Sequence, residues 1–117
     1  MTDEETIRRI AVALPEVEEQ THFSRPGFRV RDKLFASIHD DGASIIANVG
    51  PDDAAAAIED HADSLEEVWR THGTNRIFVG LRVDLAKASE QECKKWVELA
   101  WRNKAPKRLA ARLDEDR

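Results

Sequence analysis

The clearest alternation of hydrophobic and polar positions lies in residues 26–38 (PGFRVRDKLFASI). Phe28 and Val30 alternate with arginines, a polar break follows, and hydrophobic residues then return at every second position. Two runs of period two around a short polar break predict a β-hairpin over residues 28–31 and 34–39, with one face against a core. We expect the rest of the chain to supply helices and further strands that cover this hairpin.

Further extended segments are predicted on both sides of the chain's midpoint. Residues 44–49 (SIIANV) follow an Asp-Asp-Gly turn at 40–42, and the alternation at 77–83 is the most regular in the sequence. Residues 66–69 are expected to be a short extended segment before a turn at 71–75. Strands joined by tight turns favour an antiparallel sheet.

Helical spacing of hydrophobic residues marks the remaining segments. A helix over about 3–14 follows a Thr2/Glu5 capping box, and another over about 90–103 follows a Ser89/Glu92 box. A helix is also expected to begin at Gly50-Pro51 and to carry a thin apolar stripe as far as Leu65, and residues 107–113 add one or two turns. We interpret residues 15–27 as a loop because prolines bound them.

The predicted architecture is a two-layer α+β fold, α-β(3)-α-β(2)-α, with an antiparallel sheet and helices packed on one face. The length of 117 residues fits a single domain over residues 1–117. The three tryptophans, Trp69, Trp96 and Trp101, are expected to anchor the core, because rings of this size dominate the energetics of a small domain.

The charge is unevenly distributed. The formal net charge of −5 disfavours a general nucleic-acid binder. Residues 40–69 contain nine acidic residues and no lysine or arginine, whereas residues 22–39 contain four basic residues and one acidic residue. Local patches of either sign are therefore expected.

The composition also bears on where the protein works. Cys93 is the single cysteine, so no intramolecular disulfide is possible and a reducing compartment is expected. The N-terminal residues are charged, and no apolar run approaches the roughly 18 to 20 residues that span a bilayer. We expect a cytoplasmic protein without a membrane segment.

Three motifs in order resemble one known family. They are residues 14–19 (LPEVEE), His22-Phe23 ahead of Pro26, and residues 28–30 (FRV) followed by residues 33–36 (KLFA). Together with the order of predicted elements, these residues resemble the MmcQ/YjbR-like family of small bacterial proteins, over nearly the whole chain. The third motif is the strongest of the set.

The resemblance implies a compact α+β domain, similar to frataxin-like and secretion-chaperone-like folds. Members of the family are commonly labelled as DNA-binding, and no enzymatic activity is associated with it. The label rests on fold analogy, which is a weak argument for function. The sequence also departs from the family, because members often carry a tryptophan-containing, glycine-rich segment where this chain has Thr71 to Arg76 (THGTNR).

A basic and aromatic sheet face is the first candidate site. We expect one set of alternating apolar residues to face the helices: Phe28, Val30, Leu34, Ala36, Ile38, Ile77, Val79 and Leu81. The opposite face, which includes Phe35 and Phe78, then offers guanidinium groups for phosphates and rings for base stacking. The residues of this nucleic-acid hypothesis are Arg29, Arg31, Lys33, Phe35, His39 and Arg82. The alternative is that Phe35 and Phe78 pair across strands while the arginines remain solvated, or that a second subunit or other protein partner covers the face.

A small-molecule pocket at His22, Arg25 and Arg29 is the second candidate. It rests on loop residues that match the family. The histidines share no metal-ligand spacing, and the acidic residues between 52 and 67 follow the pattern of a solvated helix face, so no metal or cofactor is predicted. No nucleophile motif is present, and Cys93 lies on an apolar helix face, so we expect no catalytic residues and no enzyme activity.

Overall fold

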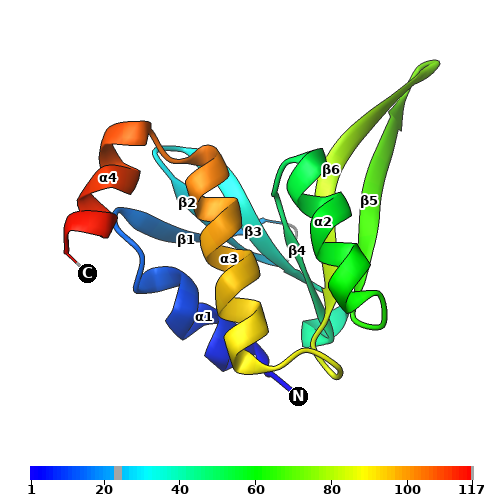
Figure 1. The fold of residues 1–117 in the computed structure, drawn as a ribbon, viewed down its shortest axis with the longest axis horizontal. Helices are drawn as coiled ribbons and strands as arrows, with labels where there is room; N and C mark the ends of the chain where they lie inside the picture. Colours follow the sequence, from blue (N-terminus) through cyan, green and yellow to red (C-terminus); the bar gives the residue numbers. More distant parts are fainter. Residues whose placement is uncertain (23–24, 117) are drawn as a thin grey trace.

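A six-stranded antiparallel sheet, covered by helices on one face, forms the body of the protein (Figure 1). The computed structural model describes residues 1–22 and 25–116. The strand order is β1-β2-β3-β4-β6-β5. The strands are β1 (Val17–His22), β2 (Arg25–Val30), β3 (Lys33–His39), β4 (Ser44–Ala47), β5 (Leu65–His72) and β6 (Asn75–Asp84), and a short 3₁₀ turn, η1 (Asp40–Gly42), joins β3 to β4.

The helices are α1 (Glu4–Val12), α2 (Pro51–His61), α3 (Glu90–Lys104) and α4 (Lys107–Glu115). Helix α3 packs on β3 and β4 and contacts α1, whereas α2 packs on β5 and β6. The predicted Ser89/Glu92 capping box of α3 is confirmed. The predicted Thr2 box is wrong, because Asp3 caps α1 and the Thr2 hydroxyl donates instead to the Ala88 carbonyl oxygen at 2.8 Å.

The α+β class with an antiparallel sheet is confirmed, but the sheet has one strand more than the sequence pattern indicated. Residues 17–22, which we interpreted as part of a loop, form β1 and pair with β2. Strand β1 lies at the edge of the sheet, and its residues between Glu18 and Thr21 are exposed. A polar edge strand has no alternation to detect, because neither of its faces is fully buried.

The core lies between the sheet and the helices. Trp96 and Trp101 are buried there as predicted, and the Trp101 indole donates to the Pro15 carbonyl oxygen at 3.1 Å. Cys93 is also buried, and burial raises the pKa of its thiol. Each large apolar side chain removed from water contributes about 1.5 to 3 kcal/mol. The other large side chains that are fully buried are Ile7, Phe28, Val30, Phe35, Ile38, Ile45, Val49, Leu81, Leu85 and Leu109.

A β-bulge in β3 reverses the prediction for Phe35. Phe28 pairs with Ala36 and Arg29 pairs with Leu34, so Phe35 is an extra residue without a partner on β2. An extra residue shifts the alternation by one position. Phe35 therefore joins the core with no exposed surface, and half-buried Leu34 lies beside Gly27 on the other face. The predictions that Phe35 is exposed and that Leu34 faces the helices are wrong.

A second bulge, in β6, shapes the hairpin that β5 and β6 form. Val68 pairs with Gly80 and Trp69 pairs with Phe78, so Val79 is the extra residue. Beyond it Ile77 is exposed and Phe78 packs partly against the core, the reverse of the predicted faces. The turn lies within the predicted residues 71–75 but is shorter, because β5 runs to His72 and β6 begins at Asn75, and their hairpin projects from the body of the protein (Figure 1).

Candidate functional site

The face of the sheet opposite the helices carries most of the polar residues predicted for the site. Strand pairing brings side chains from four strands into one row across this face. The row consists of Ser37, Ile46, Arg82 and Glu66. A second row, two residues further along each strand, consists of His39, Ser44 and Asp84. We call this surface the open face.

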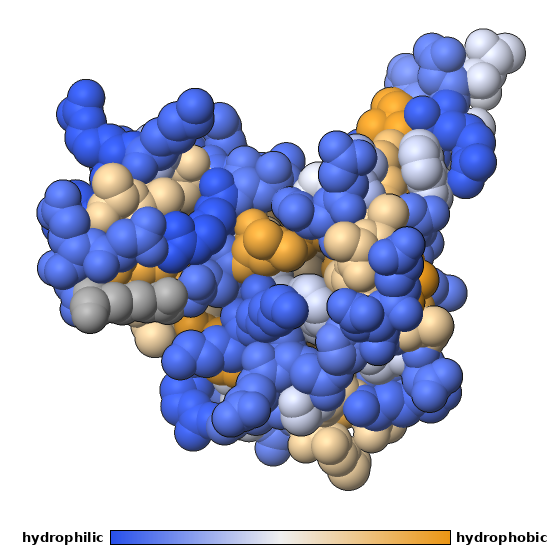
Figure 2. Space-filling view, in the orientation of Figure 1, coloured by the Kyte–Doolittle hydropathy of each residue, from blue (hydrophilic) through white to orange (hydrophobic). Residues whose placement is uncertain are grey.

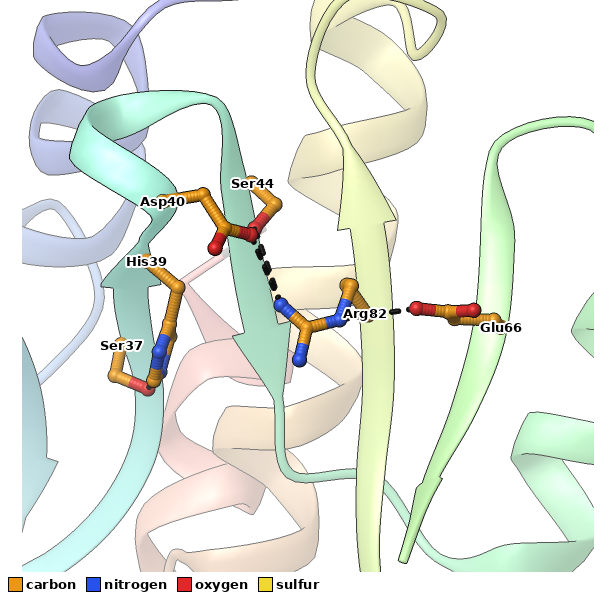
Figure 3. Close-up of polar contacts among 6 residues, drawn as sticks. All are labelled: Ser37, His39, Asp40, Ser44, Glu66 and Arg82. Carbon is orange, nitrogen blue, oxygen red and sulfur yellow. Dashed lines mark hydrogen bonds and ion pairs between the residues drawn. The ribbon is translucent and has the colours of Figure 1, made fainter.

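Arg82 is held between two carboxylates on the open face (Figure 3). Its Nη1 lies 3.0 Å from Asp40 Oδ2, and its Nε lies 3.0 Å from Glu66 Oε1. The Ser44 hydroxyl also donates to Asp40 at 2.5 Å, and this bond, with the charge of Arg82, lowers the pKa of Asp40. The positive charge of Arg82 is therefore matched by two negative charges, which weakens its attraction for a phosphate.

A cavity of about 400 Å³ lies beside Arg82. Its lining carries four carboxylates and one guanidinium group, so its field is negative. The charged lining residues are Asp40, Asp63, Glu66, Arg82 and Asp84. This composition disfavours an anionic ligand such as a phosphate.

Arg31 is a turn residue rather than part of the open face. Arg31 and Asp32 both have positive φ, +50° and +66°, which matches a two-residue type I′ turn between β2 and β3. The Arg31 guanidinium donates to both carboxylate oxygens of Glu16, at 2.5 and 3.0 Å. This pair lowers the pKa of Glu16, and it occupies the Nε and Nη2 donors of Arg31, one of the two edges of the guanidinium that can bind a phosphate.

The other two cations of the β2–β3 hairpin differ in their surroundings. Arg29 donates from Nη1 to the Asp32 carbonyl oxygen at 3.1 Å, so it braces the turn. Lys33 is exposed. The structure thus brings Arg29, His39 and Arg82 to the open face, and it leaves Arg31 and Lys33 at the turn.

His39 and Ser37 are neighbours on the open face (Figure 3). His39 Nε2 lies 2.7 Å from Ser37 Oγ. Burial lowers the pKa of His39, and the charges of Arg25 and Arg82 lower it further, against the opposing effect of Asp40. The contact follows from strand geometry, because residues two apart on a strand share a face. Neither residue lines the cavity beside Arg82.

The predicted pocket at His22, Arg25 and Arg29 falls partly beyond the described residues. The His22 side chain and residues 23–24 lie outside them. Arg25 is exposed at the start of β2, and Arg29 is half-buried four residues later on the same strand. Neither arginine lines the cavity beside Arg82.

A cluster of aromatic and cationic side chains lies on one face of the projecting hairpin. We call it the hairpin cluster, and its members are Trp69, Arg76 and Phe78, whereas the exposed Ile77 lies on the other face of the ribbon. Trp69 contacts Phe78 edge to face with ring centroids 5.1 Å apart, and the Arg76 guanidinium lies over the Trp69 ring at 4.6 Å. Trp69 and Ile77 remain 40% and 41% exposed, which corrects the prediction that Trp69 anchors the core. Figure 2 shows hydrophobic surface on the hairpin where it leaves the body.

Sequence reasoning missed the hairpin cluster, although one signal was present. Between Val68 and Val79 the chain contains Arg70 and Arg76 and no carboxylate, directly after the acidic stretch that ends at Glu67. The hidden bulge at Val79 made Ile77 look like a core residue and Phe78 like a surface residue. An abrupt change of charge at the start of an exposed hairpin was the signal that could have found it.

No group of three His, Cys, Asp or Glu side chains in the described part of the chain is arranged to hold a metal ion. None of the helices among residues 1–22 and 25–116 has the length and the apolar character that crossing a membrane requires.

Comparison with known proteins gave one match. A protein-family model described as YjbR matches residues 12–103. The matched range runs from the end of α1 to the last turn of α3, so it includes all six strands and the hairpin cluster. No curated protein and no solved structure matches the chain significantly.

Proposed function

The chain belongs to the YjbR family, and from this premise we propose that it is a protein-association module without catalytic activity, whose contact element is the β5–β6 hairpin. The observation that carries the proposal is the hairpin cluster. Large aromatic and arginine side chains are enriched at the centres of protein interfaces, and they contribute most of the binding energy there. Here such side chains project from the body on a two-stranded ribbon.

The form of the hairpin also supports a role in contact. The ribbon ends in a two-residue turn at Gly73-Thr74, where Gly73 has a φ of +63° that suits hairpin turns. Every residue from Trp69 to Ile77 is exposed. Isolated exposed hydrophobic residues need no explanation, but the exposed Trp69 ring contacts both Phe78 and Arg76 on one face of the ribbon.

Nucleic-acid binding through the basic sheet face is the other function that the family resemblance implies. The structure gives it less support than the sequence pattern did. Phe35 is buried and cannot stack on a base, and Arg31 and Arg82 are engaged by three carboxylates. We therefore treat nucleic acid as an alternative outcome of the experiment below.

The absence of catalysis is part of the proposal. Among the described residues, the Ser37–His39 contact is the pairing of a hydroxyl with an imidazole that resembles a nucleophile and its base. To act as a nucleophile and its base, the pair would need a substrate pocket beside it. The cavity beside Arg82 is lined by other residues. Residues two apart on a strand share a face, so strand geometry explains the contact and no catalytic role is needed to explain it.

Site-specific photo-crosslinking in cells tests the proposal. A photoreactive phenylalanine analogue replaces Phe78 in one variant and Ala111, which is exposed on α4, in a matched control. We expect a discrete adduct at position 78 that protease removes and nuclease does not, and no adduct at position 111. An adduct at position 78 that nuclease removes would overturn the proposal in favour of nucleic acid, and the absence of any adduct would overturn both.

Purified protein gives an independent measurement. Nucleic-acid contacts made through phosphates weaken steeply with salt. We expect fluorescence anisotropy with duplex and single-stranded DNA to show no salt-sensitive binding for the wild type. Binding that is lost in the Arg29→Glu/Arg31→Glu variant and retained in an Arg70→Glu/Arg76→Glu variant would restore the basic sheet face as the functional surface.

A further inference from the structure

Strand β5 ends the sheet on the side opposite β1, and in the described part of the chain its outer edge pairs with no strand. Figure 1 shows α2 over the face of the sheet, which leaves this margin open. An edge strand presents unpaired backbone N–H and C=O groups, which make it a template for another strand. The edge is also regular, because the extra residue of the nearby bulge, Val79, belongs to β6.

The charges along β5 are complementary to themselves when the strand is reversed. Glu66 and Glu67 lie near its start, and Arg70 lies near its end. Glu66, Val68 and Arg70 alternate onto the open face, because β5 itself contains no extra residue. An antiparallel copy of the strand can therefore bring Arg70 of each copy opposite Glu66 of the other.

We propose that the hairpin's partner is a second copy of this chain, and that the two copies pair antiparallel through β5 with Val68 on the two-fold axis. This inference rests on the proposed function, since it names the partner of the same element. The two sheets then become one continuous sheet of twelve strands, with the helices of both copies on the same face.

The register follows from charge and from the sheet's two faces. A two-fold axis perpendicular to the sheet keeps like faces together, so the axis passes through one residue of β5 and its equivalent. With Val68 on the axis, Glu66 lies directly opposite Arg70 of the second copy, and symmetry makes the pair twice. With Trp69 on the axis, Arg70 would lie opposite Val68 and lack a carboxylate partner. Opposite charges that face each other directly across strands stabilise a pairing.

The other edge of the sheet provides a contrast. Strand β1 carries Glu18 and Glu19 in its first half and Gln20, Thr21 and His22 after them, with no lysine or arginine. Antiparallel pairing of two β1 strands brings no arginine or lysine to either glutamate. The pattern of charge therefore selects β5 over β1 as the edge that pairs with itself.

The proposed interface between the two copies is small, so we expect the dimer to have a low affinity. Stable interfaces usually bury about 1,200–2,000 Å² in total, and one pair of short strands falls toward the lower end. Exposed ion pairs contribute little affinity, so Glu66 and Arg70 act chiefly on orientation and register. We expect a reversible dimer whose population rises with protein concentration.

A cysteine placed on the axis tests the register. In antiparallel strands, directly opposed residues have Cα atoms about 4.5–5.5 Å apart, which suits a disulfide. We expect Val68→Cys to form a disulfide-linked dimer on mild oxidation. Gln20→Cys, in the middle of the β1 edge, is the matched control and should form no disulfide-linked dimer. Wild-type Cys93 is buried and should not interfere.

Sedimentation velocity over a range of concentrations tests the dimer without a disulfide. We expect Arg70→Glu to weaken dimerisation at least tenfold, because it places like charges opposite Glu66, and Arg70→Lys to retain it. A monomeric wild type at all concentrations would overturn the inference, as would a Val68→Cys variant that links no faster than Gln20→Cys or an Arg70→Glu variant that dimerises normally.

The outcomes separate this inference from the proposed function. A protein adduct at position 78 whose mass is not that of two copies would leave the association module standing and remove the second copy as its partner. A nucleic-acid adduct at position 78, or no adduct at all, would overturn both the association module and the second copy as its partner.

Discussion

Gly80 on β6 packs directly against the backbone of Ala47 on β4: a Cβ atom at position 80 would lie 2.2 Å from the Ala47 carbonyl oxygen. Real Cβ atoms do not approach backbone oxygen so closely. The strands can therefore keep this spacing only if residue 80 has no side chain.

We expect Gly80→Ala to lower the free energy of unfolding by about 2 to 3 kcal/mol, since overpacking forces the backbone to move. Gly73→Ala is the matched control, because a Cβ there meets open space and its cost comes from positive φ alone, about 1 kcal/mol. Urea unfolding of the two variants measures the difference. Equal stabilities would contradict the close approach.

Phe35 offers a direct test of the bulge in β3. Because its ring is fully buried, Phe35→Ala should lower the free energy of unfolding by about 3 to 5 kcal/mol. Leu34→Ala, one residue earlier and half-buried, should cost distinctly less. If Phe35→Ala were as stable as wild type by urea unfolding, its ring would be exposed and the original nucleic-acid hypothesis would regain a stacking residue.

The tryptophans should divide into two classes. Trp101→Ala removes a buried ring and leaves the Pro15 carbonyl oxygen without its indole donor, so we expect a loss of about 3 to 5 kcal/mol. Trp69→Ala should cost about 1 kcal/mol or less, because that ring is 40% exposed. Thermal unfolding monitored by circular dichroism ranks the two. The opposite ranking would place Trp69 in the core.

His39 should make stability depend on pH. Its pKa in the folded chain lies below the ordinary 6.5, chiefly through burial and then through Arg25 and Arg82. The unfolded chain therefore binds the proton more readily, so acidification from about pH 6.5 towards the folded pKa should lower stability, and stability should recover as pH rises.

Urea unfolding at several pH values measures this effect, and His39→Gln should reduce the slope. Proton NMR of the imidazole gives the folded pKa directly, and Arg25→Gln should raise it by removing a repelling charge. An unchanged slope in His39→Gln would assign the pH dependence to another group.

The fold class could be predicted from the sequence because most strands and helices show their own period. Phe28, Val30, Leu81 and Val83 alternate into the core as expected, and Trp96 and Trp101 follow helical spacing. Strand β1 could not be found in this way, because its exposed residues are polar and show no alternation of hydrophobic and polar positions.

The site was harder to predict because two single residues change the phase of two strands. Each bulge, at Phe35 and at Val79, moves every residue on one side of it to the opposite face of the sheet. The pattern of hydrophobic residues in the sequence does not show where such an unpaired residue is inserted. The ion pairs of Arg31 and Arg82 were also out of reach. Their partners Glu16, Asp40 and Glu66 are close in space but not in an arrangement that spacing encodes.

The strand order also determines the expected kinetics of folding. Four of the five strand pairings join consecutive strands and close short loops, whereas β4 and β6 are separated in the sequence by α2 and β5. Local hairpins close within microseconds, and pairings that close long loops are slower. The rate-limiting step should then be docking of the β5–β6 hairpin onto a preformed β1–β4 meander. Substitutions in the β4–β6 seam, such as Val83→Ala, should slow refolding more than substitutions in β1.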